Sequence, residues 1–134
     1  MSEYYTTDTP LDNTKCLRQA LEDLGVPFEE HVEPTVHWHG RAPGPCDFVI
    51  RRASLGGHAY NDLAWRWNPA TRRFDLVVDN LDHQYNEQVQ GLIRRATQLH
   101  NAHKAIMTAR RLGYAVRGPV NRTASGHLQI HLSR

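Results

Sequence analysis

Apolar residues recur every three or four positions in two segments, which predicts two amphipathic helices. The first covers about residues 11–24, where Asp12 or Asn13 can serve as the N-cap and Gly25 supplies a left-handed stop. The second is longer and covers about residues 86–112. Its predicted apolar stripe consists of Val89, Leu92, Ala96, Leu99, His103 and Ile106.

Other segments alternate apolar with polar residues, which is typical of strands. In the last of these, residues 126–133, Leu128, Ile130 and Leu132 alternate with three polar residues. The remaining predicted strands cover residues 35–39, 46–52, 58–67, 73–79 and 114–116. Because the links between the middle strands are short, antiparallel pairing is favoured.

The element order α-β-β-β-β-α-β-β predicts an α+β protein with a mostly antiparallel sheet. We expect the N-terminal helix and the long helix to pack on one face of it. With 134 residues the chain can bury one core, so residues 11–134 are predicted as a single domain. Residues 1–10 are polar and are predicted to be a disordered tail.

Residues 65–79, WRWNPATRRFDLVVD, place two tryptophans, three arginines and a phenylalanine around one turn. Because side chains alternate across a strand, Trp65 and Trp67 share a face, and Phe74 can pack against them from the next strand. Base-stacking platforms need rings on the solvated face, which the arginines take here. We therefore predict that the three rings belong to the core.

Arginine dominates the basic residues, with 14 of the 16, although the net charge is only +2. Eight arginines form adjacent pairs at 51/52, 72/73, 94/95 and 110/111. Arg66 can pair with Asp75 or Asp79 across the strands. The candidate surface for phosphate or an acidic partner consists of Arg66, Arg72, Arg73, Arg94, Arg95, Arg110 and Arg111. A solvated surface without binding function is the alternative.

The chain has nine histidines, several at the spacing of metal ligands. The candidate ligands form three pairs: His37 with His39, His100 with His103, and His127 with His131. A zinc or iron site requires these pairs to converge, and the sequence contains no HExxH or CxxC motif. Histidines on half-buried faces are the alternative, and no other cofactor is predicted. Acid–base chemistry would need two of the carboxylates Asp62, Asp75, Asp79 and Asp82 to meet in a cleft.

Cysteine usage and hydropathy indicate the compartment. The only two cysteines, Cys16 and Cys46, form no disulfide framework, which favours a reducing interior. The N-terminal residues lack the apolar region of a signal peptide, and no window approaches the 18 apolar residues of a membrane span. We expect a cytoplasmic protein.

The pattern as a whole resembles the domain-of-unknown-function family 1257, whose plastid members are called hypothetical chloroplast reading frame thirty-five. The resemblance rests on Leu17, Ala20-Leu21, Leu24-Gly25, residues 62–68, residues 74–79, Thr97-Gln98, His103, Gly113-Tyr114, Leu128 and Ile130. The family's usual Ser-His-Phe-Ser-like first strand is absent, and the turn after Asn68 is longer than its usual Asn-Gly hairpin.

The resemblance implies a domain of bacteria, plastids or their phages without established catalytic residues. Members of the family look as if they often neighbour a AAA-type ATPase and a small partner protein. The expected function is therefore a non-enzymatic accessory or protein-interaction module, with such an ATPase as a candidate partner. A nucleic-acid-binding protein that uses the Arg pairs is the first alternative, and a His-based metal-dependent enzyme is the second.

Overall fold

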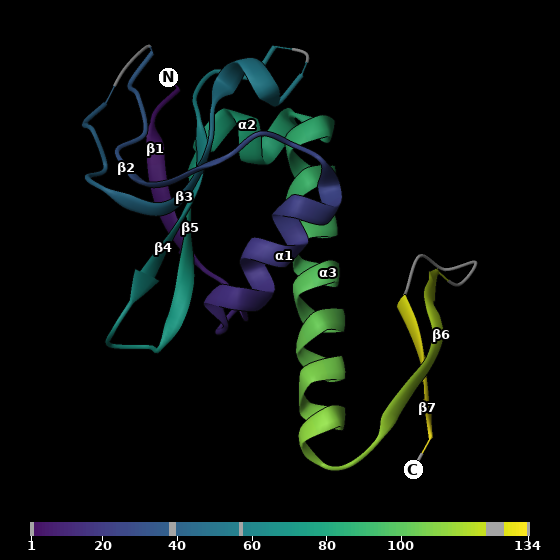
Figure 1. Ribbon diagram of the computed structural model, residues 1–134. Coiled ribbons are helices and arrows are strands. Elements are labelled where there is room, and N and C mark those ends of the chain that lie inside the picture. Colours follow the sequence, from purple (N-terminus) through teal and green to yellow (C-terminus); the bar gives the residue numbers. More distant parts are fainter. Residues whose placement is uncertain (1, 38–39, 57, 123–127, 134) are drawn as a thin grey trace.

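The computed structural model describes residues 2–37, 40–56, 58–122 and 128–133 (Figure 1). The elements in chain order are β1 (Tyr4–Asp8), α1 (Thr14–Leu24), β2 (Glu29–Val32), β3 (Cys46–Ile50), a 3₁₀ turn (Arg52–Ser54), β4 (Leu63–Asn68), β5 (Arg73–Asp79), α2 (Asn80–Tyr85), α3 (Glu87–Arg111), β6 (Ala115–Arg122) and β7 (Leu128–Ser133). The predicted α+β class is confirmed.

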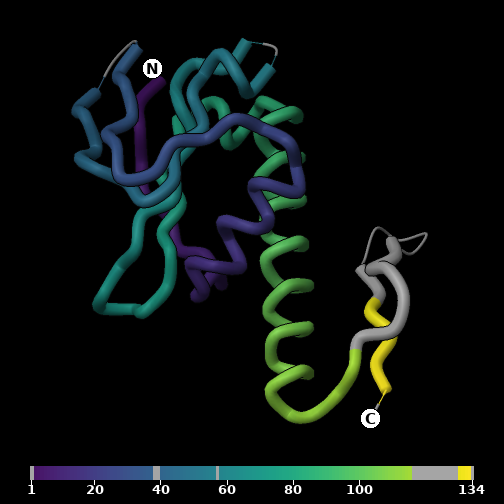
Figure 2. The backbone as a smooth tube through the Cα atoms, viewed as in Figure 1, coloured from purple at the N-terminus to yellow at the C-terminus, as the bar shows by residue number. Residues whose placement is uncertain are grey.

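The strands form two separate sheets. Five antiparallel strands make the larger one, in the order β1-β5-β4-β3-β2, while β6 pairs only with β7. In Figures 1 and 2, α1 lies between the larger sheet and α3, and the β6–β7 hairpin runs along the far side of α3. The two C-terminal strands therefore do not extend the main sheet.

The core lies between the larger sheet and its two helices. Trp65 and Phe74 are buried on the inner sheet face together with Phe48, and Leu17 and Leu21 of α1 pack into the same cluster. This confirms the prediction for two of the three rings. The prediction for Trp67 is wrong in part. Its ring contacts that of Phe74 edge-on, with 5.1 Å between the centroids, but 36% of its surface stays exposed.

Both main helices begin and end close to the predicted positions. Asn13 caps α1 by accepting a hydrogen bond from the amide of Cys16 at 2.9 Å, and Gly25 ends it with φ 69°. The stripe predicted for α3 is shifted, because His100 is fully buried while His103 is only half-buried. The buried side of α3 contains Leu92, Ala96 and His100, which are spaced four residues apart and face α1.

The N-terminal residues are ordered, contrary to the predicted disordered tail. Residues Tyr4–Asp8 form β1, an edge strand that pairs with β5 over five positions. The hydroxyl of Tyr4 donates a hydrogen bond to the carbonyl of Thr35 at 2.7 Å. Strand β1 has a polar composition because it buries little of its surface, but its Tyr and Thr residues favour extended backbone.

Two predicted strands are misplaced, and side-chain hydrogen bonds explain both. The amides of Thr35 and His37 donate to Asp62 and Asn61 rather than to a neighbouring strand, so no strand forms over residues 35–37. His39 lies outside the described residues. In the segment 58–67 the strand begins only at Leu63, because the preceding amides at residues 60 and 61 donate to Asp82.

Candidate functional site

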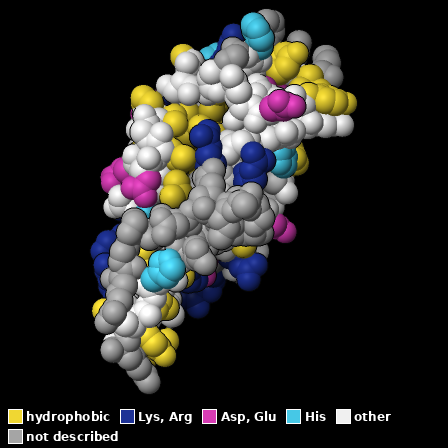
Figure 3. Space-filling model, turned by 90° about the vertical axis from the view of Figure 1, so that its right-hand side faces the viewer, with side chains coloured by type: hydrophobic (Ala, Val, Ile, Leu, Met, Phe, Trp, Pro, Cys, Tyr) yellow, Lys and Arg dark blue, Asp and Glu magenta, His cyan; other side chains and the backbone are white. Residues whose placement is uncertain are grey.

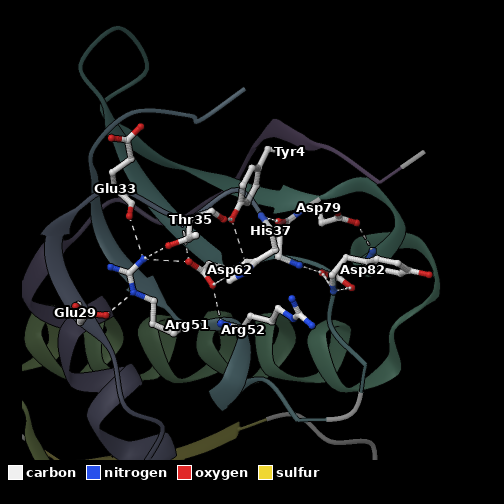
Figure 4. Close-up of polar contacts among 12 residues, drawn as sticks. Tyr4, Glu29, Glu33, Thr35, His37, Arg51, Arg52, Asp62, Asp79 and Asp82 are labelled. Carbon is white, nitrogen blue, oxygen red and sulfur yellow. Dashed lines mark hydrogen bonds and ion pairs between the residues drawn. The ribbon is translucent and has the colours of Figure 1, made fainter. Parts of the chain in front are cut away.

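Asp62 is the centre of a polar network at the end of the molecule where α2 lies (Figures 1 and 4). Its carboxylate is 1% exposed and accepts hydrogen bonds from the amides of Thr35 at 2.8 Å and Arg52 at 2.7 Å. The guanidinium of Arg51 donates to it at 3.0 Å, and His37 Nε2 lies 3.2 Å away. One carboxylate thus holds three chain segments in place.

The hydrogen bonds decide the protonation state of Asp62. Burial alone would raise the pKa of this carboxyl, but the bonds from Thr35, Arg52, Arg51 and His37 outweigh it and lower the pKa below its usual value. Burial and the nearby Asp62 charge together raise the pKa of Tyr4, whose hydroxyl accepts the amide of Asp62 at 3.0 Å. At neutral pH, Asp62 is therefore ionised and Tyr4 protonated.

Two more buried carboxylates continue the network beside Asn61. Asp79 accepts hydrogen bonds from Asn61 Nδ2 at 2.8 Å and from the hydroxyl of Ser2 at 2.5 Å. Its other oxygen caps α2 through the amides of Leu81 and Asp82. Asp82 accepts the amides of residues 60 and 61, and burial raises its pKa despite these bonds. The carboxylates of Asp79 and Asp82 lie near each other, but hydrogen-bond donors of the chain itself already occupy their oxygens.

Three neighbouring clefts open at this end of the molecule. The first, of about 690 Å³, is lined by His37, Arg52, Ala53, Gly56, His58, Ala59 and Tyr60. It shares His58 and Tyr60 with a second cleft of about 480 Å³ that also touches Leu81, Asp82, Tyr85, Asn86, Glu87 and Gln88. A third, of about 420 Å³, is lined by Tyr5, Asn80, His83 and Gln84 on α2 and β1.

Tyrosines stand around these clefts with much of their surface in solvent. Tyr5 is 40% exposed, Tyr60 41% and Tyr85 70%. The hydroxyl of Tyr5 is hydrogen-bonded to His83 Nδ1. We call the surface formed by Tyr5, Tyr60, Tyr85, His58 and His83 the aromatic end.

His37 connects the buried network with the first cleft. An ionised carboxylate only accepts hydrogen bonds, so Nε2–H of His37 donates to Asp62 and this contact orients the ring. The side chain is 29% exposed. An oriented imidazole at the wall of a cleft can hydrogen-bond a polar group of a bound molecule.

The predicted arginine surface is not brought together as one site. Arg66 donates to the carbonyl of Pro43, and Thr6 Oγ1 lies 3.5 Å from it. Arg66 lies opposite Asp75 in the β4–β5 ladder, as predicted, but the described ion pairs include none between them, and the Asp75 carboxylate accepts Asn68 Nδ2 at 3.0 Å. Arg72 and Arg73 are exposed at the β4–β5 turn, which Figure 1 places across α1 from α3.

The other four predicted arginines lie on α3, and all are exposed. Arg94 and Arg95 are in the first half of the helix, while Arg110 and Arg111 are in its last turn. The offset of sixteen positions from one pair to the other corresponds to about 24 Å along the axis. These positions therefore form an extended surface rather than a pocket.

The described histidines do not converge as metal ligands. His100 Nε2 accepts the amide of Asn13 at 3.2 Å, and His103 Nε2 is 2.6 Å from Asp23 Oδ2. His131 is exposed on β7. His39 and His127 lie outside the described residues. Within the described ranges, no three His, Cys, Asp or Glu residues gather as a metal site.

Sequence reasoning named the carboxylates of this end but not what surrounds them. Asp79 caps α2, and Asn86 caps α3. Asn61, Tyr60 and Tyr85 were missed. The adjacent polar pair Asn61-Asp62 immediately before an apolar strand was the available signal, since buried polar residues need fixed partners.

The fold and site define a class: a small α+β domain with a buried carboxylate network under a tyrosine-rich surface. Residues 20–130 match the family described as "Protein of unknown function (DUF1257)", and the chain belongs to this family. No curated protein and no solved structure matches the chain. Among the described residues, no helix has both the length and the apolar character needed to cross a membrane.

Proposed function

We propose that this protein is a non-enzymatic interaction module that docks a partner protein at the aromatic end. The observation that supports it most is the grouping of Tyr5, Tyr60 and Tyr85 around neighbouring clefts. Tyrosine is enriched at protein interfaces because it offers a large ring and a polar hydroxyl at low entropic cost. A AAA-type ATPase is the candidate partner that the family resemblance suggests.

The buried network supports the same proposal because it makes the surface rigid. Asp82 accepts the amides of residues 60 and 61 and so fixes the backbone at Tyr60. Asp62 accepts the amides of residues 35 and 52 and so fixes two further segments. A surface that is already ordered loses little conformational entropy when a partner binds. The carboxylates thus act as scaffold for the aromatic end.

The first test removes two rings and asks whether capture is lost. Full-length protein carrying Tyr60→Ala and Tyr85→Ala is used as bait in extract of the native host, beside wild-type protein. We expect the partner that wild-type protein captures to bind the double variant at least tenfold more weakly, as is common when central interface tyrosines are truncated. Binding is quantified by titration of the purified partner.

Trp67→Ala is the matched control, because Trp67 is also a partly exposed ring but belongs to β4, outside the aromatic end. It should leave capture unchanged. Capture that survives the double tyrosine change, or that depends equally on Trp67, would place the docking surface elsewhere. Wild-type bait that retains no reproducible partner would contradict the proposed function itself.

A further inference from the structure

Acidic and basic residues are segregated along the chain. All 14 Asp and Glu residues lie within the first 87 positions, which also hold eight Lys and Arg, for a formal charge of −6. The 47 residues after Glu87 contain no acidic residue and carry +8, so the two parts together give the chain's +2. The eight cations are Arg94, Arg95, Lys104, Arg110, Arg111, Arg117, Arg122 and Arg134.

The fold places this basic part on one side of the molecule. Helix α3 and the β6–β7 hairpin lie side by side, with the hairpin on the side of α3 opposite to α1 and the larger sheet (Figures 1 and 2). Figure 3 looks onto that side and shows Lys and Arg side chains around the hairpin. We call the surface formed by Arg94, Arg95, Arg110 and Arg111 the basic face.

The arginines of α3 differ from the other basic residues in their described ion pairs. Arg18 and Arg51 are bound to Glu30, Glu29 and Asp62, and Lys104 is bound to Asp12. Among the described residues, by contrast, no carboxylate lies within ion-pair distance of the four exposed arginines on α3. Their charge is therefore available to a ligand.

We propose that the basic face binds the phosphate backbone of a nucleic acid. The four cations of the basic face are all Arg, whose planar fork matches phosphate oxygens in a bidentate way. The two pairs on α3 are about 24 Å apart, a distance over which a duplex carries about 14 phosphate charges. Arg95 and Arg110, one from each pair, are fifteen positions apart and lie within about 60° of each other around the helix axis, so an elongated ligand of repeating charge can contact both along one side of α3.

An acidic protein suits this surface less well than a nucleic acid. It would have to present carboxylates at both ends of the same 24 Å span (about 16 residues of helix), whereas a phosphate backbone supplies charge at every position. The proposal does not depend on the aromatic end. The basic face and that end use different residues, so either can fail without the other.

The test measures binding of the full chain, purified without a His tag, to labelled 30-residue single-stranded DNA, duplex DNA and single-stranded RNA by fluorescence anisotropy. We expect binding at 50 mM salt that weakens at least tenfold by 200 mM, because counterions are released from the phosphates. Arg110→Gln with Arg111→Gln should weaken it tenfold or more and lower the salt slope by about two.

Arg72→Gln with Arg73→Gln is the matched control, because it also removes two exposed adjacent arginines but on the β4–β5 turn. It should change affinity less than twofold. The proposal is overturned by three results: no binding to any of the three probes at 50 mM salt, equal losses in both double variants, or equally tight binding to poly-glutamate. Circular dichroism of both variants confirms that they are folded.

Discussion

At the scale of single residues, Asp62 shows how one side chain can determine local structure. Its carboxylate is buried, yet four hydrogen-bond donors compensate for the lost hydration. A charged acceptor with this many donors lowers the free energy of the folded state more than a neutral one could. The loop before β3 and the turn after it are thereby attached to the start of β4.

Asp62→Asn should destabilise the protein by about 3 kcal/mol, because it removes the charge that Arg51 faces and places an amide group where donors converge. The measurement is urea unfolding at pH 7, compared with wild type. Since the folded-state pKa of Asp62 is lowered, the contribution of its charge to the free energy of unfolding is fully present above the unfolded-state pKa of about 3.9. The contribution disappears as the pH falls through the lower folded value.

The difference in unfolding free energy between wild type and Asp62→Asn should therefore shrink below about pH 4. A difference that stays constant down to pH 2.5 would show that the charge of Asp62 is unimportant. Asp75→Asn is the control, because that carboxylate has one described side-chain donor, Asn68. It should cost about 1 kcal/mol.

The partners of Asp62 could not be predicted from the sequence. Its residue type and the polar pair with Asn61 are visible, but Thr35 and His37 are more than twenty positions away. Local alternation in Thr-Val-His-Trp-His suggests a strand, but the amide of Thr35 donates to the distant Asp62 and that of His37 donates to Asn61 Oδ1. Tertiary hydrogen bonds here override local pattern.

At the scale of elements, His100 joins α3 to the beginning of α1. The imidazole is fully buried, accepts the Asn13 amide at Nε2 and lies 3.0 Å from Asn101 Oδ1 at Nδ1. Because the amide N–H points at Nε2, the ring must be neutral with its proton on Nδ1. Its position was predicted as a metal ligand, but the ring serves the contact between the two helices.

His100 should make the stability of the protein depend on pH below about 6.5. Burial lowers the pKa of the folded-state imidazole, so the unfolded chain binds a proton first as the pH falls. Stability is then full above about pH 6.5 and falls by up to about 1.4 kcal/mol per pH unit until the folded pKa is reached. Urea unfolding between pH 7.5 and 5 measures this slope.

His100→Gln keeps an amide acceptor near Asn13 and cannot be protonated. The unfolding free energy of this variant should therefore decrease less steeply than that of wild type as the pH falls below about 6.5. The exposed His131→Gln on β7 is the control and should follow wild type. If His100→Gln keeps the wild-type slope, another group is responsible for it.

At the scale of the whole molecule, the α+β class and the two main helices were predictable, but β1, α2 and the division into two sheets were not. Periodicity shows that residues 115–133 contain strands, yet it carries no information on which edge they join. In the structure β1 takes the edge of β5, so the C-terminal hairpin pairs only with itself. The N-terminal residues that composition suggests as a tail thus complete the sheet.

The hairpin should be separable from the rest of the fold. Two strands alone are at most marginally stable, and this pair packs on α3 rather than on the core of the larger sheet. A chain that ends after Gly113 should keep cooperative urea unfolding and lose no more than about 2 kcal/mol. The predicted single domain would then end with α3 rather than at residue 134.

Removal of residues 1–9 is the informative comparison, because it deletes fewer residues but breaks the β1–β5 ladder and the bonds of Ser2 and Tyr4 to the buried network. It also leaves β5 as an unpaired edge strand of the larger sheet. We expect it to abolish cooperative unfolding. If instead the loss of the hairpin is the more damaging change, α3 depends on β6 and β7 for its position, and residues 11–134 are one folding unit.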